Sequence, residues 1–137
     1  CIMFDLNNLK KVNDAMGHQA GDNMIRSFAQ LLRKAVPPTE FVGRYGGDEF
    51  IVIMNEVTPG EVDAFLEKLA NMTVDYNRSG TQLMPVIPLS YAAGFAHSAQ
   101  VPNSTMASLL KVADSNMYAN KAQIKAALGK EEQASFR

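Results

Sequence analysis

The sequence predicts an α+β sandwich, in which helices pack on a mostly antiparallel central sheet. Two observations carry this prediction. Apolar residues recur at steps of three and four along several segments, and shorter apolar runs of strand length lie between those segments. In addition, residues 46–49 are the only link between two of the short runs, which favours an antiparallel hairpin.

The size and charge of the chain exclude several classes of protein. We expect its 137 residues to form a single domain over 1–137. Thirteen basic and fourteen acidic residues give a net charge of −1, which argues against a nucleic-acid partner. The single cysteine, Cys1, excludes a disulfide-rich secreted scaffold. No apolar stretch approaches the roughly 20 residues of a membrane span, so we expect a cytoplasmic domain without membrane contact of its own.

The first element begins at the start of the sequence. Residues 2–6 are an apolar run that predicts a buried strand. The start of the sequence has no basic segment of the kind that begins a signal peptide. We therefore expect the sequence to begin inside a larger protein, which could be membrane-anchored through a region that is not in this chain.

Two helices are expected next. Residues 9–16 have helical composition and end at Gly17, and Asp22 stands just ahead of a second helix that Pro37 and Pro38 terminate. The apolar residues of the second helix recur at helical spacing and comprise Met24, Ile25, Phe28, Leu31, Leu32, Ala35 and Val36.

The hairpin and a third helix follow. Residues 40–45 and 50–54 predict the two hairpin strands. Thr58 and Glu61 flank a Pro-Gly pair in the pattern of a capping box, so a helix is expected over residues 59–76.

The last part of the chain predicts one more strand and one more helix. Residues 86–95 include a strand, and Asn103 or Ser104 is expected to cap a final helix that passes through Met117. The order strand, helix, strand, strand, helix, strand, helix is nearest to the ferredoxin-like βαββαβ arrangement.

The turn of the hairpin has two interpretations. In the first it is a plain turn, in which Gly46 and Gly47 supply positive φ and the acids keep the turn in water. In the second, Asp48 and Glu49 hold Mg²⁺ while a phosphate approaches the bare backbone. Asp5 ends the first strand, and the three acids converge if that strand lies beside the hairpin. Two metal ions held there would clamp a phosphoryl transfer. Spacing alone leaves both interpretations open.

Four segments match the motifs of one protein family, in the order in which that family has them. Residues 46–50 read GGDEF, and residues 4–14 resemble the pattern FD-x-D-x-F-K-x-x-ND, with Asn7 in place of its second D and Leu9 in place of its second F. Residues 17–22 follow GH-x-x-GD, and residues 113–121 follow AD-x-x-[LM]Y-x-x-K. The chain thus resembles the GGDEF domains, the diguanylate cyclases, over nearly its whole length, without the family's opening helix. The resemblance also implies a fold related to nucleotidyl cyclase and polymerase palm domains.

The resemblance implies a reaction between two GTP molecules. They condense to cyclic di-GMP with loss of two pyrophosphates, when the 3′-hydroxyl of one GTP attacks the α-phosphate of the other. It also implies two Mg²⁺ or Mn²⁺ ions per active site, a second GGDEF domain that meets this one face to face, and an upstream regulatory domain outside this chain. Such chemistry consists mostly of positioning and charge neutralisation.

The resemblance further assigns the metal ligands. It implies that Asp5, the Leu6 carbonyl, Asp48 and Glu49 hold the metal, and that Asp48 helps to deprotonate the attacking hydroxyl. The two glycines of the signature let the backbone approach the α-phosphate, because a side chain there would block it.

The resemblance assigns the GTP contacts as well. Asn13 and Asp22 are implied as guanine readers, and a carboxylate at Asp22 disfavours ATP because adenine lacks the matching pair of donors. Lys121 is implied to neutralise the terminal phosphates, with help from Lys10, and Lys125 keeps a charge near them. Structural interpretations remain open beside these. Asp22 is then a helix N-cap and Asn13 ends the short helix. Lys121 and Lys125, four residues apart on the last helix, then form a solvated face.

Three departures from the family pattern affect the functional prediction. Asn7 replaces the second acid of the FD-x-D segment, and Lys125 replaces an arginine. Pro37 stands where the family's inhibitory R-x-x-D site has its arginine, and proline offers no guanidinium for the product. We therefore expect no product feedback through that site. The first two departures keep open an alternative function, a non-catalytic regulatory domain that binds GTP.

Overall fold

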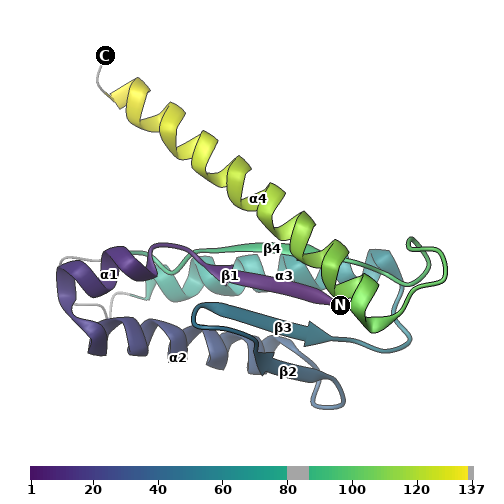
Figure 1. Cartoon of the computed structure of the whole chain (residues 1–137). Coiled ribbons are helices and arrows are strands. Elements are labelled where there is room, and N and C mark those ends of the chain that lie inside the picture. The colour runs from purple at the N-terminus through teal and green to yellow at the C-terminus, as the bar shows by residue number, and fades with distance from the viewer. Residues whose placement is uncertain (80–86, 136–137) are drawn as a thin grey trace.

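The computed structural model describes residues 1–79 and 87–135 (Figure 1). The elements in these ranges are β1 (Ile2–Leu6), α1 (Leu9–Met16), α2 (His18–Ala35), β2 (Phe41–Arg44), β3 (Glu49–Ile53), α3 (Pro59–Arg78), β4 (Tyr91–Phe95) and α4 (Met106–Ser135). The predicted α+β class is confirmed. The elements follow the predicted order, except that two separate helices, α1 and α2, lie between β1 and β2.

The four strands form one antiparallel sheet in the order β2-β3-β1-β4. β1 is central, and all five of its residues are buried, which explains why its sequence is a continuous apolar run broken only by Asp5. The hairpin prediction is confirmed by the pairing of β2 with β3. β3 begins one residue earlier than expected because Glu49 already pairs with Asp5 of β1.

Helices cover the two faces of the sheet unequally. α2 and α3 pack on one face, and α4 crosses the other (Figure 1). The first face is filled by a cluster of aromatic rings in edge-to-face or tilted contact, namely Phe4, Phe28, Phe50 and Tyr91. The buried residues of the second face are fewer and include Met3, Ile51, Ala92, Ala113 and Met117.

The start of α2 differs from the prediction. Gly17, with φ of 90°, reverses the chain directly from α1 into α2, so the helix begins at His18. Asp22 therefore lies inside the helix and is not its N-cap. By contrast, the predicted start of α3 is confirmed, because Thr58 is its N-cap and accepts the Glu61 N–H on Oγ1 at 3.1 Å.

The last helix also starts later than expected. Thr105 precedes its first residue and accepts the Ser108 N–H at 3.1 Å, so neither Asn103 nor Ser104 is the cap. β4 occupies the end of the segment in which a strand was expected, while residue 86 lies outside the described residues. No helix in the described ranges is long and apolar enough to cross a bilayer.

Candidate active site

Three carboxylates meet where β1 ends and β3 begins. The antiparallel register places Asp5 directly opposite Glu49. The Leu6 N–H donates to the Asp48 carbonyl at 2.8 Å, which holds the hairpin turn against the end of β1. Directly opposite residues of two antiparallel strands share one face of the sheet. The Asp5 and Glu49 side chains therefore lie on the same face, with Asp48 beside them.

The carboxylates are crowded and partly dehydrated. The Asp5 side chain is 5% exposed, and its Oδ1 atom is buried without a hydrogen-bond partner. Burial, and then the negative charge of Asp5, raise the pKa of Asp48. Burial, followed by the charges of Asp5, Asp114 and Asp48, raises the pKa of Glu49 as well. Negative charge is therefore in excess at this corner of the sheet.

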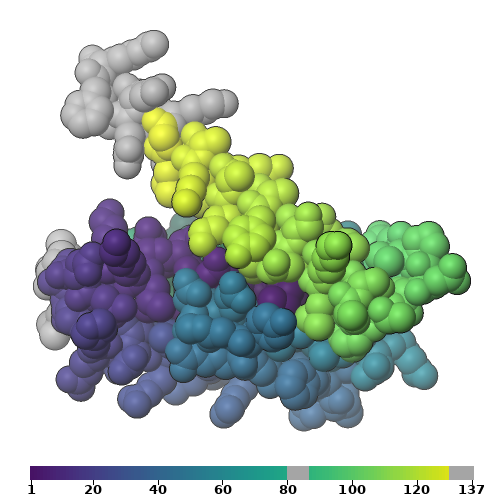
Figure 2. Space-filling view, in the orientation of Figure 1, coloured from purple at the N-terminus to yellow at the C-terminus, as the bar shows by residue number. Residues whose placement is uncertain are grey.

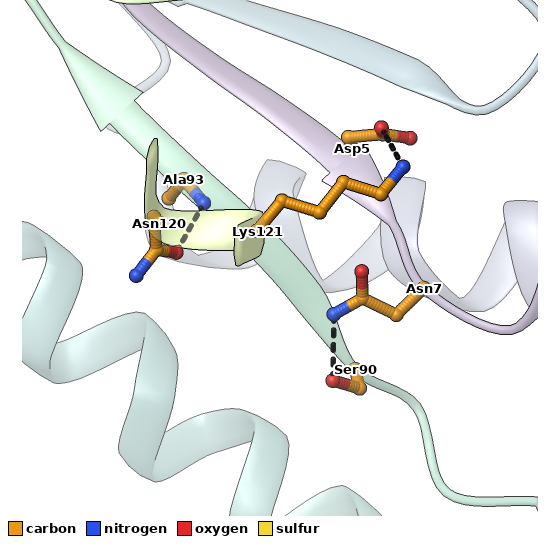
Figure 3. Close-up of polar contacts among 6 residues, drawn as sticks. All are labelled: Asp5, Asn7, Ser90, Ala93, Asn120 and Lys121. Atoms are coloured by element: carbon orange, nitrogen blue, oxygen red, sulfur yellow. Dashed lines mark hydrogen bonds and ion pairs between the residues drawn. The ribbon is translucent and has the colours of Figure 1, made fainter. Parts of the chain in front are cut away.

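One lysine offsets part of that charge. Lys121 of α4 reaches across the sheet, and its Nζ donates to Asp5 Oδ2 at 2.7 Å (Figure 3). This hydrogen bond raises the pKa of Lys121. The Lys121 side chain is still 26% exposed, so part of it remains open to solvent.

The donor set fits a hard divalent cation. Within residues 1–79 and 87–135, no three His, Cys, Asp or Glu side chains form a ready metal-binding group. However, Asp5 Oδ1 has no hydrogen-bond partner, and the pKa values of Asp48 and Glu49 are raised. A bound cation would stabilise the charged form of all three carboxylates. These three residues are the ones that could hold a divalent cation.

The glycines of the turn do not have the predicted conformation. Among the described glycines, only Gly17 has positive φ, so Gly46 and Gly47 are not required for a left-handed turn. The turn is shaped instead by Arg44, whose guanidinium donates to the Gly46 and Gly47 carbonyls at 3.1 and 2.7 Å. A side chain added at Gly47 would project into open space. The glycines thus leave a bare backbone surface next to Asp48.

A second group of predicted residues lies on α1 and α2. Asn13 of α1 packs so closely on Gly21 of α2 that a Cβ at this glycine would overlap the Asn13 amide. The Asn13 Oδ1 atom is buried and has no hydrogen-bond partner. Asp22 follows Gly21 and is exposed. The turn at Gly17 therefore brings two unsatisfied or exposed polar groups onto adjacent helices.

The remaining predicted residues lie outside the carboxylate cluster. Lys10 is exposed in the first turn of α1, and Lys125 is exposed one turn beyond Lys121 on α4. Asn7, which replaces an acid of the family motif, donates from Nδ2 to Ser90 Oγ at 3.0 Å (Figure 3). Asn7 thereby ties the end of β1 to the segment before β4.

The contact between α4 and β4 is unusually close at Gly94. A Cβ at this position would overlap the backbone of α4 at Met117 and Asn116. The absence of a side chain therefore lets the helix backbone rest on the strand. From the sequence alone, the segment around Gly94 is only a strand with a glycine in it.

Two asparagines of α4 also bond to β4, and sequence reasoning missed both. Asn116 Nδ2 donates to the Phe95 carbonyl at 2.9 Å, and Asn120 Oδ1 accepts the Ala93 N–H at 3.0 Å. Both asparagines fall on unspecified positions of the AD-x-x-[LM]Y-x-x-K pattern. No signal in the sequence separates them from ordinary helix surface residues.

Comparison with known proteins gives a consistent result. A family model described as "Diguanylate cyclase, GGDEF domain" matches residues 1–127. The chain is 33% identical over 121 residues to the signaling protein YkoW of Bacillus subtilis, covering 88% of this chain and 15% of that protein. It is 32% identical over 127 residues to the response regulator PleD of Caulobacter vibrioides, covering 88% of this chain and 26% of PleD. The chain thus spans about a quarter or less of the length of these relatives.

The fold also matches a solved structure. The GGDEF domain of DgcB from Caulobacter crescentus, crystallised in complex with c-di-GMP, superposes with a TM-score of 0.78. The sequences are 29% identical, and the match covers 89% of this chain and 71% of that one.

Proposed function

The chain belongs to the GGDEF family of diguanylate cyclase domains, and from this premise we propose that it condenses two GTP molecules into cyclic di-GMP. The 3′-hydroxyl oxygen of each GTP forms a bond to the α-phosphorus of the other. The bond between the α-phosphorus and the oxygen bridging to the β-phosphate breaks, and pyrophosphate leaves with that electron pair. Two such transfers close the ring and release two pyrophosphates and two protons.

The convergence of Asp5, Asp48 and Glu49 is the observation that carries this proposal. These side chains, with the Leu6 carbonyl beside them, would hold two Mg²⁺ or Mn²⁺ ions. Bound metal supplies Lewis-acid stabilisation of the charge on the phosphoryl oxygens. Asp48 accepts the proton of the attacking hydroxyl.

Guanine is read between α1 and α2. Asp22 is exposed and accepts hydrogen bonds from guanine N1–H and the exocyclic amino group. Asn13 contributes its amide, which the missing side chain of Gly21 accommodates. Adenine would leave the Asp22 carboxylate without matching donors, so GTP is preferred over ATP.

The phosphates lie between the hairpin and the lysines. The bare backbone of Gly46 and Gly47 lets the α-phosphate approach. Lys121 stands beside the carboxylates, so a triphosphate that reaches them meets a positive charge. The exposed Lys10 and Lys125 add positive charge at the margins of the same region.

Each domain supplies one half of the reaction centre. In this proposal residues 1–137 act as one catalytic domain that holds one GTP, and a second copy brings the other GTP face to face. An upstream regulatory domain of a longer cytoplasmic or membrane-anchored protein controls that meeting. Activity per protomer should therefore rise with protein concentration.

The proposed enzyme lacks product feedback at the position of the family's inhibitory site. Pro37 has no group that donates to a guanine or phosphate. The carboxylate of Glu40, three residues later, already accepts the Asn55 N–H at 3.0 Å. Adding cyclic di-GMP to the reaction should leave the initial rate unchanged, and a fall in rate would contradict this part of the proposal.

Product analysis tests the main proposal. The chain, at high concentration or fused to a dimerising segment, is mixed with GTP and Mg²⁺ and the products are separated by chromatography. We expect cyclic di-GMP and pyrophosphate, and no product from the Asp48→Ala variant. GTP binding without any product in the dimerised protein would favour the non-catalytic regulatory domain instead. Full activity of Asp48→Ala would refute the assignment of the site.

A further inference from the structure

Lys121 lies near the point at which α4 leaves the sheet. The helix continues to Ser135, and its later turns project away from the body of the domain (Figures 1 and 2). Of the described α4 residues after Lys121, only Ile124 packs against the core. A lysine has a long side chain with many rotamers. The position of its ammonium group therefore depends on how firmly the helix is held at this point.

Two hydrogen bonds hold α4 along the strand it crosses. β4 is an edge strand of the sheet, and the unpaired backbone groups of an edge strand need partners. Asn116 satisfies the Phe95 carbonyl, and Asn120 satisfies the Ala93 N–H, four residues further along the helix. The two bonds are one helical turn apart and resist both rotation and sliding of α4.

We propose that Asn120 is a positioning residue that holds Lys121 against Asp5. Asn120 and Lys121 are adjacent, so their side chains diverge by about 100° around the helix axis. Asn120 turns to the outer edge of β4, while Lys121 crosses the sheet to β1 (Figure 3). Fixing the Asn120 side chain on Ala93 thus fixes the origin of the Lys121 side chain.

Asn116 serves as a matched control, because it helps to dock α4 on β4 without positioning Lys121. It makes the same kind of bond to the same strand, but at Phe95, the end of β4 that lies away from Asp5. Removing either asparagine should weaken the contact between α4 and β4. Only removal of Asn120 should disturb the pair between Lys121 and Asp5.

A thermal-unfolding cycle tests the proposal without nucleotide or metal. The variants are Asn120→Ala, Lys121→Met and their combination, with Asn116→Ala and its combination with Lys121→Met as the matched set. We expect the Tm losses of Asn120→Ala and Lys121→Met to add up to more than the loss in their double variant. The losses of Asn116→Ala and Lys121→Met should simply add, as they do for independent sites. Additive losses in both sets, or equal non-additivity in both, would overturn the proposal.

GTP titration of the same variants adds a second measurement, the Kd for GTP. A residue that only docks α4 on β4 should not change this Kd. This arm rests on the proposed function, in which Lys121 binds phosphate. We expect Asn120→Ala to raise the Kd for GTP several-fold, but not in the presence of Lys121→Met, and Asn116→Ala to leave it unchanged. If Lys121→Met itself does not alter the Kd while the unfolding cycle holds, the phosphate role of Lys121 is wrong and the positioning role of Asn120 stands. An equal rise in Kd from Asn120→Ala with and without Lys121 would overturn the positioning role.

Discussion

The two faces of the sheet use the same central strand for different purposes. Side chains alternate along β1, so Phe4 and Leu6 enter the aromatic core beneath α2 and α3, while Met3 and Asp5 face α4. Large rings bury much apolar area on the first face. Small residues on the second face, above all Gly94, let a helix backbone approach and bring Lys121 to Asp5. The larger apolar core therefore lies on one face of β1, and the candidate catalytic side chains lie on the other.

Removing a ring from the aromatic face should have the largest effect on stability. Phe28 is fully buried and contacts Phe4, Phe50 and Tyr91. We expect Phe28→Ala to lower the free energy of unfolding by about 3–5 kcal/mol, measured by urea denaturation. Met16→Ala, at an exposed position, should change it by less than about 0.5 kcal/mol. Similar losses in the two variants would contradict the placement of the core.

Adding one methyl group to the α4 face should damage both stability and the site. In Gly94→Ala the new Cβ overlaps the backbone of α4, which must move away. We expect a loss of about 1–3 kcal/mol in the free energy of unfolding, together with weaker GTP binding by isothermal titration. Gly129→Ala is the control for GTP binding, because a Cβ there meets nothing within 4 Å and its only expected effect is a gain of up to about 1 kcal/mol in helix propensity. Unchanged GTP affinity in a destabilised Gly94→Ala would show that the close approach of α4 at Gly94 does not govern GTP binding.

A methyl group at Gly21, which lies against Asn13, should weaken GTP binding without lowering stability. Gly21→Ala gains up to about 1 kcal/mol of helix propensity, which offsets the displacement of the Asn13 amide. We expect nearly unchanged stability. The Kd for GTP should rise about tenfold, which corresponds to a loss of about 1.4 kcal/mol in binding free energy. In an Asn13→Ala background the same change should have no further effect on the Kd. If Gly21→Ala raised the Kd just as much in that background, Asn13 would not be a guanine-binding residue.

The smallest effect should be a gain in stability from removing a carboxylate. The pKa of Asp48 is raised in the folded state, so its ionisation opposes folding once the pH exceeds the ordinary value of an aspartate. Without metal, Asp48→Asn should therefore raise the Tm slightly at neutral pH. The gain should disappear in acid, where the carboxyl is protonated in both states. Asp63→Asn on the exposed side of α3 is the control, and a gain that persists in acid would contradict this explanation.

Elements with a strong local pattern could be predicted from the sequence. The limits of α1 and the N-cap at Thr58 follow from nearby residues, and the structure has them as expected. The hairpin is also present, with its second strand starting one residue early at Glu49. The start of α2 was missed because the backbone reversal at Gly17, rather than a capping side chain, begins that helix. The cap of α4 was missed by one residue for a different reason, since Asn103, Ser104 and Thr105 are all residue types that cap helices and only the backbone conformation selects Thr105.

By itself, the sequence determined the fold class, the family and the list of candidate site residues, because motifs and periodicities are local properties. Only the tertiary structure decided which of these residues touch. Lys121 and Asp5 are 116 positions apart, and their pairing depends on strand order and on a helix seated over Gly94. The roles of Asn116 and Asn120 arise in the same way. A side chain that bonds to the edge of a distant strand leaves no periodic trace in its own segment.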